Sequence, residues 1–402
     1  MSGEKSAERF DVAIVGGCGH VGLPLGIVLA DTGLRTLLYD IDRKAVDCVN
    51  RGALPHTEPG AAAALARVQA QGRLHASADP SGIAGCGTVI IVVGTPIDEH
   101  GNPDVEAVPR VVSAIAEHLR DGQLLVLRST VYPGVTALVE RLVARLGKAV
   151  DVAFCPERIA EGRAMSELYE LPEIVSSRTA SGRERAAKLF GNLTRDIVHL
   201  EPEEAELAKL FTNTWRYIRF AIANQFYMIA NDFELDFERI RAAIRHNYPR
   251  AADLPGAGFA AGPCLLKDTM QLAAFNNNLF TLGNAAMMVN EGLPLYLVSR
   301  LARRYDLANM TVGLLGMGFK AESDDIRSSL AYKMNRILRF KSREVLCTDP
   351  HVTCDPNLVP LETVLARADL LIITAPHAAY AKLSASVPIV DVWNLLGQGV
   401  RV

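Results

Sequence analysis

The sequence has little of what marks membrane, secreted or nucleic-acid-binding proteins. Its apolar runs, such as 89–93 and 370–374, have the length of a strand, whereas a membrane-spanning helix needs about 20 apolar residues. Its seven cysteines are an odd number without a Cys-x-x-Cys pair, which argues against a disulfide framework and a structural zinc site and favours a reducing compartment. The net charge of −3 supplies no basic field for nucleic acid. We therefore expect a cytoplasmic protein that binds no membrane, no nucleic acid and no metal.

Length and glycine distribution indicate the domain organisation. A chain of 402 residues exceeds the size of one ordinary core. Residues 1–9 are polar and lack the apolar core of a targeting signal, so we expect a mobile leader there. Glycine is absent from 201 to 247, between two regions of alternating strand-like and helix-like patterns. We expect domains at 1–198, 199–300 and 301–402, and an α/β fold with two doubly wound Rossmann-like domains joined by a long central helix.

A glycine-rich segment near the N-terminus predicts a dinucleotide site. The apolar run 11–15 leads into Gly17-Cys18-Gly19-His20-Val21-Gly22, and a helical pattern follows. In this pattern the first glycine allows a tight turn, the second admits a pyrophosphate, and the third lets helix and strand pack closely. A second strand ends at Asp40, 23 residues after Gly17. A carboxylate there accepts ribose hydroxyls and repels a 2′-phosphate, so NAD is favoured over NADP even with Arg43 nearby.

Three further strands end in polar residues. The run 88–93 leads to Thr95 and Pro96, 123–127 leads to Thr130, and 150–154 leads to Glu157, Arg158 and Glu161. Open α/β sheets bind ligands at the carboxyl ends of their strands. The two glutamates are therefore candidate acid/base groups, and the alternative is ordinary solvated loop charges.

Cys264 is a candidate nucleophile. A small-residue run ends in Pro263-Cys264, and a helical pattern follows. Proline suits the first turn of a helix, so the thiol is expected near a helix N-terminus, where the dipole and Lys267 favour thiolate. Asp268 lies four residues on, on the same helix face. The alternative is a buried cysteine that behaves as a small hydrophobe.

The glycine-free region predicts a long amphipathic helix from Glu201 to about Asn247. Pro202 and the acidic residues after it fit a helix N-terminus. Lys209 and Asn213 are four residues apart and share one face. An ammonium and an amide side by side can stabilise an oxyanion, and the alternative is a polar stripe facing water.

The last quarter predicts a second doubly wound unit. Strands are expected at 311–315, 345–348, 370–374 and 388–392. Lys320 and Arg327 are its candidate phosphate ligands. His377 follows the third strand, where we expect an ordinary surface histidine; the alternative is a contact to a ligand.

Taken together, the motifs resemble the nucleotide-sugar 6-dehydrogenase family, whose best-known members act on UDP-glucose and UDP-N-acetylmannosamine. The resemblance runs from about residue 10 to 396 and implies an NAD domain, a central dimerising helix and a sugar-nucleotide domain. The matching motifs, in chain order, are Gly17-x-Gly19-x-x-Gly22, Glu58-Pro59-Gly60, Gly94-Thr95-Pro96, Ser129-Thr130-Val131, Pro156-Glu157 with Glu161-Gly162, Lys209-Leu210-Phe211-x-Asn213, Gly262-x-Cys264-x-x-Lys267-Asp268, Phe319-Lys320 with Asp324-Asp325-Ile326-Arg327, and Asp349-Pro350.

The resemblance implies a four-electron, NAD-dependent oxidation of the sugar C6 alcohol to a uronic acid through a Cys264 thiohemiacetal and thioester. Lys209 and Asn213 match oxyanion-stabilising positions, Glu161 the acid/base for thioester hydrolysis with Glu157 as its neighbour, and Thr130 and Asp268 residues that orient water and thiol. The implied NAD contacts are Gly17, Cys18, Gly19, His20, Val21, Gly22, Asp40, Arg43, Thr95, Pro96, Thr130 and Arg327. The implied substrate contacts are Glu157, Arg158, Glu161, Lys209, Asn213, Phe259, Gly262, Phe319, Lys320 and Arg250, the last reaching across a homodimer.

Three residues depart from the family pattern: Ala261, Pro263 and Trp393, the last replacing an arginine of many members. The sequence decides neither the sugar, glucose or N-acetylhexosamine, nor the base, uracil or thymine. Two alternative functions are a two-electron NAD-dependent hydroxyacid dehydrogenase, which needs neither Cys264 nor the C-terminal unit, and a non-catalytic sugar-nucleotide sensor.

Overall fold

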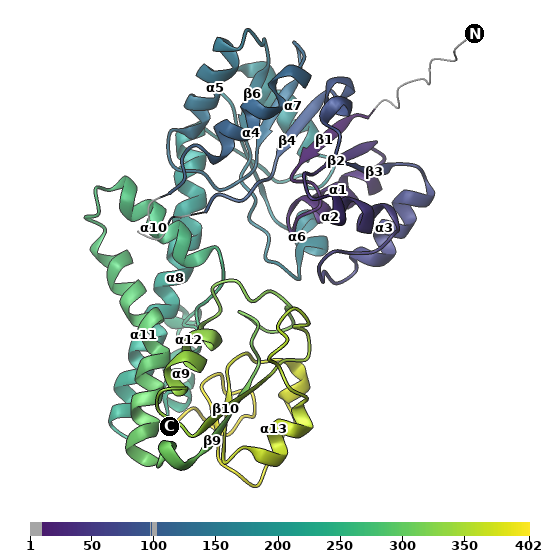
Figure 1. Cartoon of the computed structure of the whole chain (residues 1–402). Helices are drawn as coiled ribbons and strands as arrows, with labels where there is room; N and C mark the ends of the chain where they lie inside the picture. The colour runs from purple at the N-terminus through teal and green to yellow at the C-terminus, as the bar shows by residue number, and fades with distance from the viewer. Residues whose placement is uncertain (1–9, 97, 99–102) are drawn as a thin grey trace. The chain divides into compact units, whose positions relative to one another are not determined.

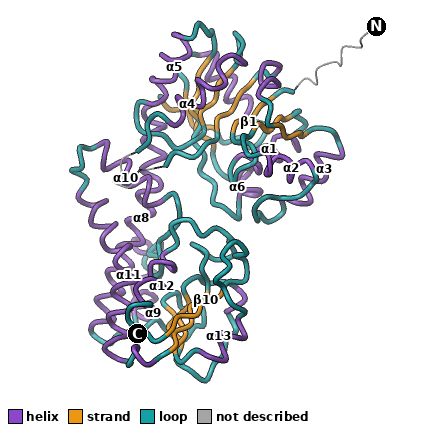
Figure 2. The backbone as a smooth tube through the Cα atoms, viewed as in Figure 1, coloured by secondary structure: helices purple, strands orange, loops and turns teal. Residues whose placement is uncertain are grey.

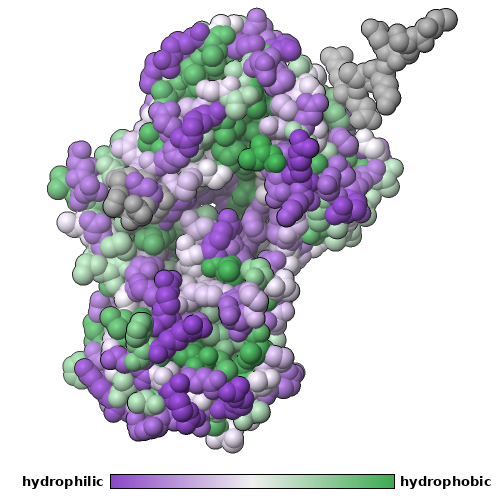
Figure 3. All heavy atoms as spheres, in the orientation of Figure 1, coloured by the Kyte–Doolittle hydropathy of each residue, from purple (hydrophilic) through white to green (hydrophobic). Residues whose placement is uncertain are grey.

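The computed structural model describes residues 10–96, 98 and 103–402 (Figure 1). The segment 1–9, for which a mobile leader was expected, lies outside the described residues. The chain forms two compact units, Met1–Phe211 and Thr212–Val402. Each contains a parallel α/β sheet, and a long helix begins in the first and continues in the second, which confirms the predicted fold class. On the face drawn in Figure 3, hydrophilic and hydrophobic side chains are interspersed over both units, as on an ordinary globular surface.

The N-terminal unit is built on an eight-stranded sheet in the order β3-β2-β1-β4-β5-β6-β7-β8. All neighbouring strands pair in parallel except β6 and β7. Because β2 and β4 flank β1, the chain winds in opposite directions from β1, and the carboxyl end of β1 is a topological switch point where such sheets bind ligands. The strands are β1 Val12–Val15, β2 Thr36–Tyr39, β3 Leu74–Ser77, β4 Thr88–Ile91, β5 Leu124–Leu127, β6 Asp151–Phe154, β7 Glu173–Ser176 and β8 Ile197–Leu200.

Helices cover both faces of this sheet (Figure 2). Along β1, Val12 and Ile14 belong to one apolar core and Ala13 and Val15 to another, so successive side chains enter opposite layers. A strand that is buried on both faces has a continuous run of apolar residues, and this run allowed β1 to be predicted from the sequence. The helices are α1 Gly22–Asp31, α2 Arg43–Asn50, α3 Ala61–Ala70, α4 Ala107–Ile115, α5 Val135–Arg145, α6 Ala164–Glu170 and α7 Ala180–Phe190, with short 3₁₀ turns η1 Pro80–Gly85 and η2 Ala116–His118.

The long helix α8 spans Pro202–Asp232, 31 residues, so its predicted extension to about Asn247 is wrong. The chain turns after Asp232, where Glu234 adopts a left-handed conformation with φ 58°. The side chain of Asp236 then accepts a hydrogen bond from the Glu238 N–H and starts a separate helix, α9 Phe237–Arg245. Capping chemistry, rather than glycine or proline, ends the helix here.

The C-terminal unit contains a second parallel sheet in the order β10-β9-β11-β12. Helices α8 and α11 run side by side next to it (Figures 1 and 2), and their side chains join β9 in one core, while α13 packs on the opposite face. The predicted strands are confirmed as β9 Thr311–Leu315, β10 Glu344–Thr348, β11 Leu370–Ile373 and β12 Ile389–Asp391. The helices are α10 Leu265–Phe275, α11 Thr281–Arg304, α12 Leu330–Leu338 and α13 Leu361–Arg367, with 3₁₀ turns η3 Pro249–Ala251, η4 Leu307–Asn309 and η5 Ala378–Tyr380.

Candidate active site

The glycine-rich loop between β1 and α1 forms a tight turn at the switch point. The N–H groups of Gly16 and Gly17 donate to the Tyr39 carbonyl at 2.9 and 3.1 Å. A Cβ at Gly17 would lie 2.8 Å from Leu38 Cα, and one at Gly22 would lie 2.3 Å from the Gly16 carbonyl oxygen. A Cβ at Gly19 would meet only that same oxygen, at 3.6 Å. Gly17 and Gly22 are therefore required by packing, whereas Gly19 keeps the loop surface clear for a close ligand such as a pyrophosphate.

The Asp40 carboxylate lies beside this loop. Its Oδ2 accepts a hydrogen bond from the Cys18 N–H and its Oδ1 from the Asp42 N–H, both at 3.0 Å. Arg43 is exposed in the first turn of α2, next to the capping residue Asp42. The carboxylate is thus fixed at the end of β2, where the ribose of a dinucleotide bound to the loop would lie. The fixed Asp40 carboxylate, an acceptor for ribose hydroxyls, and the open Gly19 fit NAD.

Polar side chains tie the neighbouring strand ends together. The Val93 N–H donates to Ser129 Oγ at 2.8 Å, and Thr95 Oγ1 donates to the Thr130 carbonyl at 2.6 Å. The loops after β4 and β5 therefore form one rigid wall on the other side of the switch point. Pro96 follows Thr95 in this wall.

A buried ion network, missed from the sequence, fixes the loop after β6. Arg128 is 1% exposed and lies between Glu157, at 2.7 Å, and Glu173, also at 2.7 Å. The other oxygen of Glu157 accepts the N–H groups of Arg158 and Ile159. Burial raises the pKa of Glu173, while Arg128 opposes that rise. The Glu157 carboxylate is fully engaged by these contacts and holds the backbone of its own loop.

Glu161, later in the same loop, lies beside the glycine-rich loop. Its Oε1 is 3.9 Å from Nδ1 of His20, and the His20 ring lies 4.1 Å from that of His56. Buried Glu58 accepts hydrogen bonds from the N–H groups of Gly162 at 2.8 Å and Ala164 at 2.9 Å. Glu58 therefore holds the backbone that presents Glu161. The same loop is also tied down where Nη2 of Arg158 donates to the Pro172 carbonyl.

Lys209 lies on α8 at the end of the N-terminal unit. It is 8% exposed, one turn before Asn213. The preceding turn is held by buried Glu206, which accepts the Gly134 N–H at 2.7 Å and both the N–H and the hydroxyl of Thr136. Burial raises the pKa of Glu206. Sequence reasoning missed this residue because an acidic residue near a helix N-terminus looks solvated.

In the C-terminal unit, Cys264 is the N-cap residue of α10, and this confirms its predicted place at a helix N-terminus. The residue is exposed. Asp268, one turn on, is fully buried; its Oδ1 lies 2.6 Å from Lys267 Nζ, and its Oδ2 accepts the Asn213 amide at 2.5 Å. The structure therefore brings together a thiol, a carboxylate, an ammonium and an amide. The Asn213 amide, predicted to face an oxyanion, donates to Asp268.

The segment before Cys264 is anchored on both sides. Asn224 on α8 makes two hydrogen bonds to Gly258, to its carbonyl at 3.0 Å and from its N–H at 2.9 Å. A Cβ at Gly258 would lie 2.2 Å from the Trp393 ring, and one at Gly262 would lie 2.6 Å from the Phe319 ring. Trp393 also packs edge-on against Phe259. Trp393 therefore packs against the loop that leads to Cys264. The sequence alone, in which Trp393 stands where many family members have an arginine, did not indicate this packing role.

The remaining predicted ligands lie on loops of the C-terminal unit. The Lys320 ammonium is 5.4 Å from the centre of the Phe319 ring. Arg327 pairs with Asp325, with Nε–Oδ2 at 2.8 Å, and its side chain is 54% exposed. Arg250 is exposed and contacts Tyr248 through its Nη1 at 3.3 Å. Both arginines are accessible to a ligand or to a second chain.

Sequence comparison matches three consecutive parts of the chain to one family. The NAD binding domain of the UDP-glucose/GDP-mannose dehydrogenase family matches residues 10–194, its central domain matches 203–292, and its UDP binding domain matches 313–398. None of the described helices is long and apolar enough to cross a bilayer.

Individual relatives are similar along nearly the whole chain. The UDP-N-acetyl-D-mannosamine dehydrogenase of Pyrococcus horikoshii is 30% identical over 96% of this chain and 92% of its own length. An NDP-N-acetyl-D-galactosaminuronic acid dehydrogenase of Ralstonia nicotianae is 30% identical over 93% of this chain and 92% of its own length. Among solved structures, a UDP-glucose dehydrogenase from Pyrobaculum islandicum has a TM-score of 0.89 at 26% identity, over 97% of this chain and 96% of that one.

Proposed function

This chain belongs to the UDP-glucose/GDP-mannose dehydrogenase family, and on that premise we propose that it oxidises the C6 alcohol of a nucleotide-linked hexose to the uronic acid with two NAD per turnover. It is an NAD-dependent oxidoreductase with an NAD binding and a UDP binding domain. The observation that carries the proposal is the exposed thiol of Cys264, the N-cap residue of α10, within a chain that also holds a dinucleotide loop. A simple alcohol oxidation requires no such thiol.

The proposed reaction proceeds through a covalent intermediate on Cys264. NAD, when bound, accepts a hydride in each of two oxidation steps. The first converts the C6 alcohol to an aldehyde, and the thiolate adds to the carbonyl carbon to give a thiohemiacetal. The second removes the remaining C6 hydride and leaves a thioester, which water cleaves to the carboxylate and the free thiol. The overall change consumes one water and releases two NADH and the matching protons.

The residues around the thiol have distinct proposed roles. The helix N-terminus of α10 and the ammonium of Lys267 favour thiolate. Asp268 holds Lys267 and Asn213 in fixed positions through its two oxygens, so it acts as a positioning residue. Lys209, buried on α8, would stabilise the oxyanion of both oxidation steps. Glu161 would activate the water that cleaves the thioester, and Thr130 would orient it.

A homodimer is the proposed assembly, because α8 carries an uncovered apolar stripe. The stripe consists of Trp215, Ile222, Phe226 and Ile229 on α8 and Phe233 directly after it, which are 56, 40, 45, 50 and 73% exposed. Their spacings of seven, four, three and four residues place them on one face of the helix. An exposed apolar patch of this kind marks a protein interface. The exposed Arg250 is then available to reach the partner's sugar site.

The substrate is proposed to be a UDP-hexose or UDP-N-acetylhexosamine. The UDP binding domain match supports the uridine base, and the relatives above are named for N-acetylated sugars and for glucose alike. The test is NADH release against a panel of UDP- and dTDP-hexoses and N-acetylhexosamines, with the product analysed by mass spectrometry. We expect two NADH per carboxylate. One NADH with a stable carbonyl product would establish the two-electron alternative, and binding without turnover on the whole panel would favour a sensor.

A further inference from the structure

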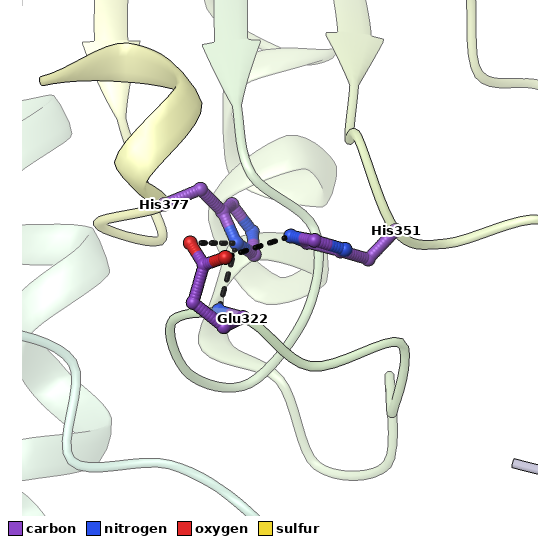
Figure 4. Close-up of side chains that lie close together, drawn as sticks. All are labelled: Glu322, His351 and His377. Carbon is purple, nitrogen blue, oxygen red and sulfur yellow. Dashed lines mark hydrogen bonds and ion pairs between the residues drawn. The ribbon is translucent and has the colours of Figure 1, made fainter. Parts of the chain in front are cut away.

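Three loops of the C-terminal unit bring two histidines and a glutamate together at the carboxyl edge of its sheet. Glu322 follows β9, His351 follows β10 and His377 follows β11. Figure 4 shows the three side chains pointing toward one another. His377 is fully buried, so the expectation of an ordinary surface histidine is wrong: the 3₁₀ turn η5 folds its ring inward against Tyr380.

The geometry of this cluster is close to that of a coordination site. His351 Nε2 lies 3.4 Å from Glu322 Oε2, and His377 Nδ1 lies 3.9 Å from Glu322 Oε1. One ligand atom from each residue lies within 4.8 Å of the other two. Ligands at about 2.0–2.2 Å from a tetrahedral ion are about 3.4 Å apart. One pair already has this spacing. The Glu322 side chain is 53% exposed, and its Oε1 accepts the Ala378 N–H at 2.6 Å, which leaves Oε2 as its ligand atom.

The second contact of His377 orients its ring as metal-binding histidines are oriented. Nε2 of His377 lies 3.1 Å from Asp349 Oδ2, and Nδ1 accepts the Glu322 N–H at 3.0 Å. Nδ1 therefore carries the lone pair, and Nε2 carries the proton that Asp349 accepts. The Asp349 carboxylate is itself fixed by the N–H groups of Met317 and Gly318. A carboxylate behind the histidine, fixing its tautomer, is the usual outer shell of a zinc ligand.

We propose that Glu322, His351 and His377 bind a zinc-class divalent ion, with Asp349 as the outer-shell partner of His377. Two imidazole nitrogens and one carboxylate suit Zn²⁺, Co²⁺ or Ni²⁺, whereas Mg²⁺ and Ca²⁺ prefer oxygen ligands alone. The ion also balances charge, because the site holds two carboxylates and, by the tautomer above, one neutral histidine. Three protein ligands leave a fourth position for water or a ligand oxygen.

Binding requires one local rearrangement. The Glu322 N–H now donates a hydrogen bond to Nδ1 of His377. This N–H has to turn away so that the lone pair of Nδ1 can bind the ion. Glu322 holds a left-handed conformation with φ 54°, which costs a residue with a Cβ energy. A rotation that returns φ to the usual negative range would recover that energy. The bound ion would link the loops after β9, β10 and β11, including the one that carries Lys320.

The experiment measures Zn²⁺ binding to the full-length protein after chelator treatment, by isothermal titration in excess Mg²⁺. We expect one Zn²⁺ per chain in the wild type, and at least tenfold weaker binding in His351→Ala and in Glu322→Gln. His118→Ala is the matched control, because His118 Nε2 lies 3.4 Å from Glu117 Oε1 without a third ligand among the described residues; its affinity should equal that of the wild type. Glu322 is exposed and His351 is half-buried, so the variants should fold.

Co²⁺ distinguishes this site from the cysteines. An ion held by nitrogen and oxygen shows the visible bands of tetrahedral Co²⁺ without the near-ultraviolet charge-transfer band of a thiolate ligand. Weak or absent Zn²⁺ binding in the wild type, a loss of less than tenfold in either variant, or a thiolate band from the tightest site would each overturn the proposal.

Discussion

Arg128→Met should destabilise the N-terminal unit strongly, and the loss should depend on pH. The guanidinium is 1% exposed and forms ion pairs with both Glu157 and Glu173. Removing one member of a buried ion network leaves uncompensated charge and costs about 3–5 kcal/mol of the free energy of unfolding. Glu157 keeps two backbone N–H donors, whereas the hydrogen bonds of Glu173 are to Arg128, so we expect most of the cost at Glu173.

The sign of the pH dependence follows from Glu173. Burial already raises its pKa, and Arg128 opposes the rise; without Arg128 the folded-state pKa rises further. A carboxyl group whose folded pKa lies above its unfolded value stabilises the fold at low pH, and this contribution is lost as pH rises through the folded pKa. The variant should therefore lose more stability, relative to the wild type, at pH 8 than at pH 5. Adding Glu173→Gln to Arg128→Met should recover part of the loss at pH 8.

Guanidinium unfolding followed by two probes checks this prediction. Far-ultraviolet circular dichroism reports both units, whereas Trp215 and Trp393, the two tryptophans of the chain, both belong to the C-terminal unit. The dichroism transition should shift more than the fluorescence transition. Arg67→Met, which breaks the surface pair with Asp31, is the control and should change little. A loss in Arg128→Met no larger than in Arg67→Met, or one that is equal at the two pH values, would refute the reasoning.

Local pattern was enough to predict the parts of the fold that local chemistry determines. The strand β1 reads as an apolar run because both its faces are buried, and Gly17 and Gly22 are required by contacts within the same β-α-β unit. The place of Cys264 at a helix N-terminus follows from Pro263 and the helical pattern after it. Each of these features depends on residues close together in the sequence.

Features that depend on distant partners were not predictable. Glu173 lies 45 residues from Arg128 in the chain, and nothing in the local sequence of either marks a buried pair. His377 was expected at the surface because it follows the end of a strand, yet Asp349, 28 residues earlier, holds it inside. The end of α8 at Asp232 was missed because no glycine or proline marks it. Whether a charged side chain is buried depends on which distant residues the fold places next to it. The sequence around that side chain does not contain this information.

Three further predictions concern the proposed reaction. NADP should be a poor cofactor because its 2′-phosphate would meet the Asp40 carboxylate, and Asp40→Ala should narrow the preference for NAD in steady-state kinetics; equal turnover of the wild type with both would contradict this role. Light scattering should show a dimer that Phe226→Glu disrupts through the stripe on α8, while Phe340→Glu, at a residue 90% exposed on the C-terminal unit, leaves it intact; an active wild-type monomer would exclude the interface. Cys264→Ala should abolish acid formation by orders of magnitude while NAD and sugar-nucleotide binding persist, since the thiol forms the covalent bond and affinity resides elsewhere. In Glu161→Gln the thioester should form but hydrolyse slowly, because the group that activates water has lost its basicity. Intact-protein mass spectrometry after addition of substrate and NAD should then show the sugar-nucleotide adduct, and the double variant with Cys264→Ser should show none. Acid formation by Cys264→Ala at near the wild-type rate, without an adduct in Glu161→Gln, would rule out covalent catalysis and leave Cys264 a structural cap of α10.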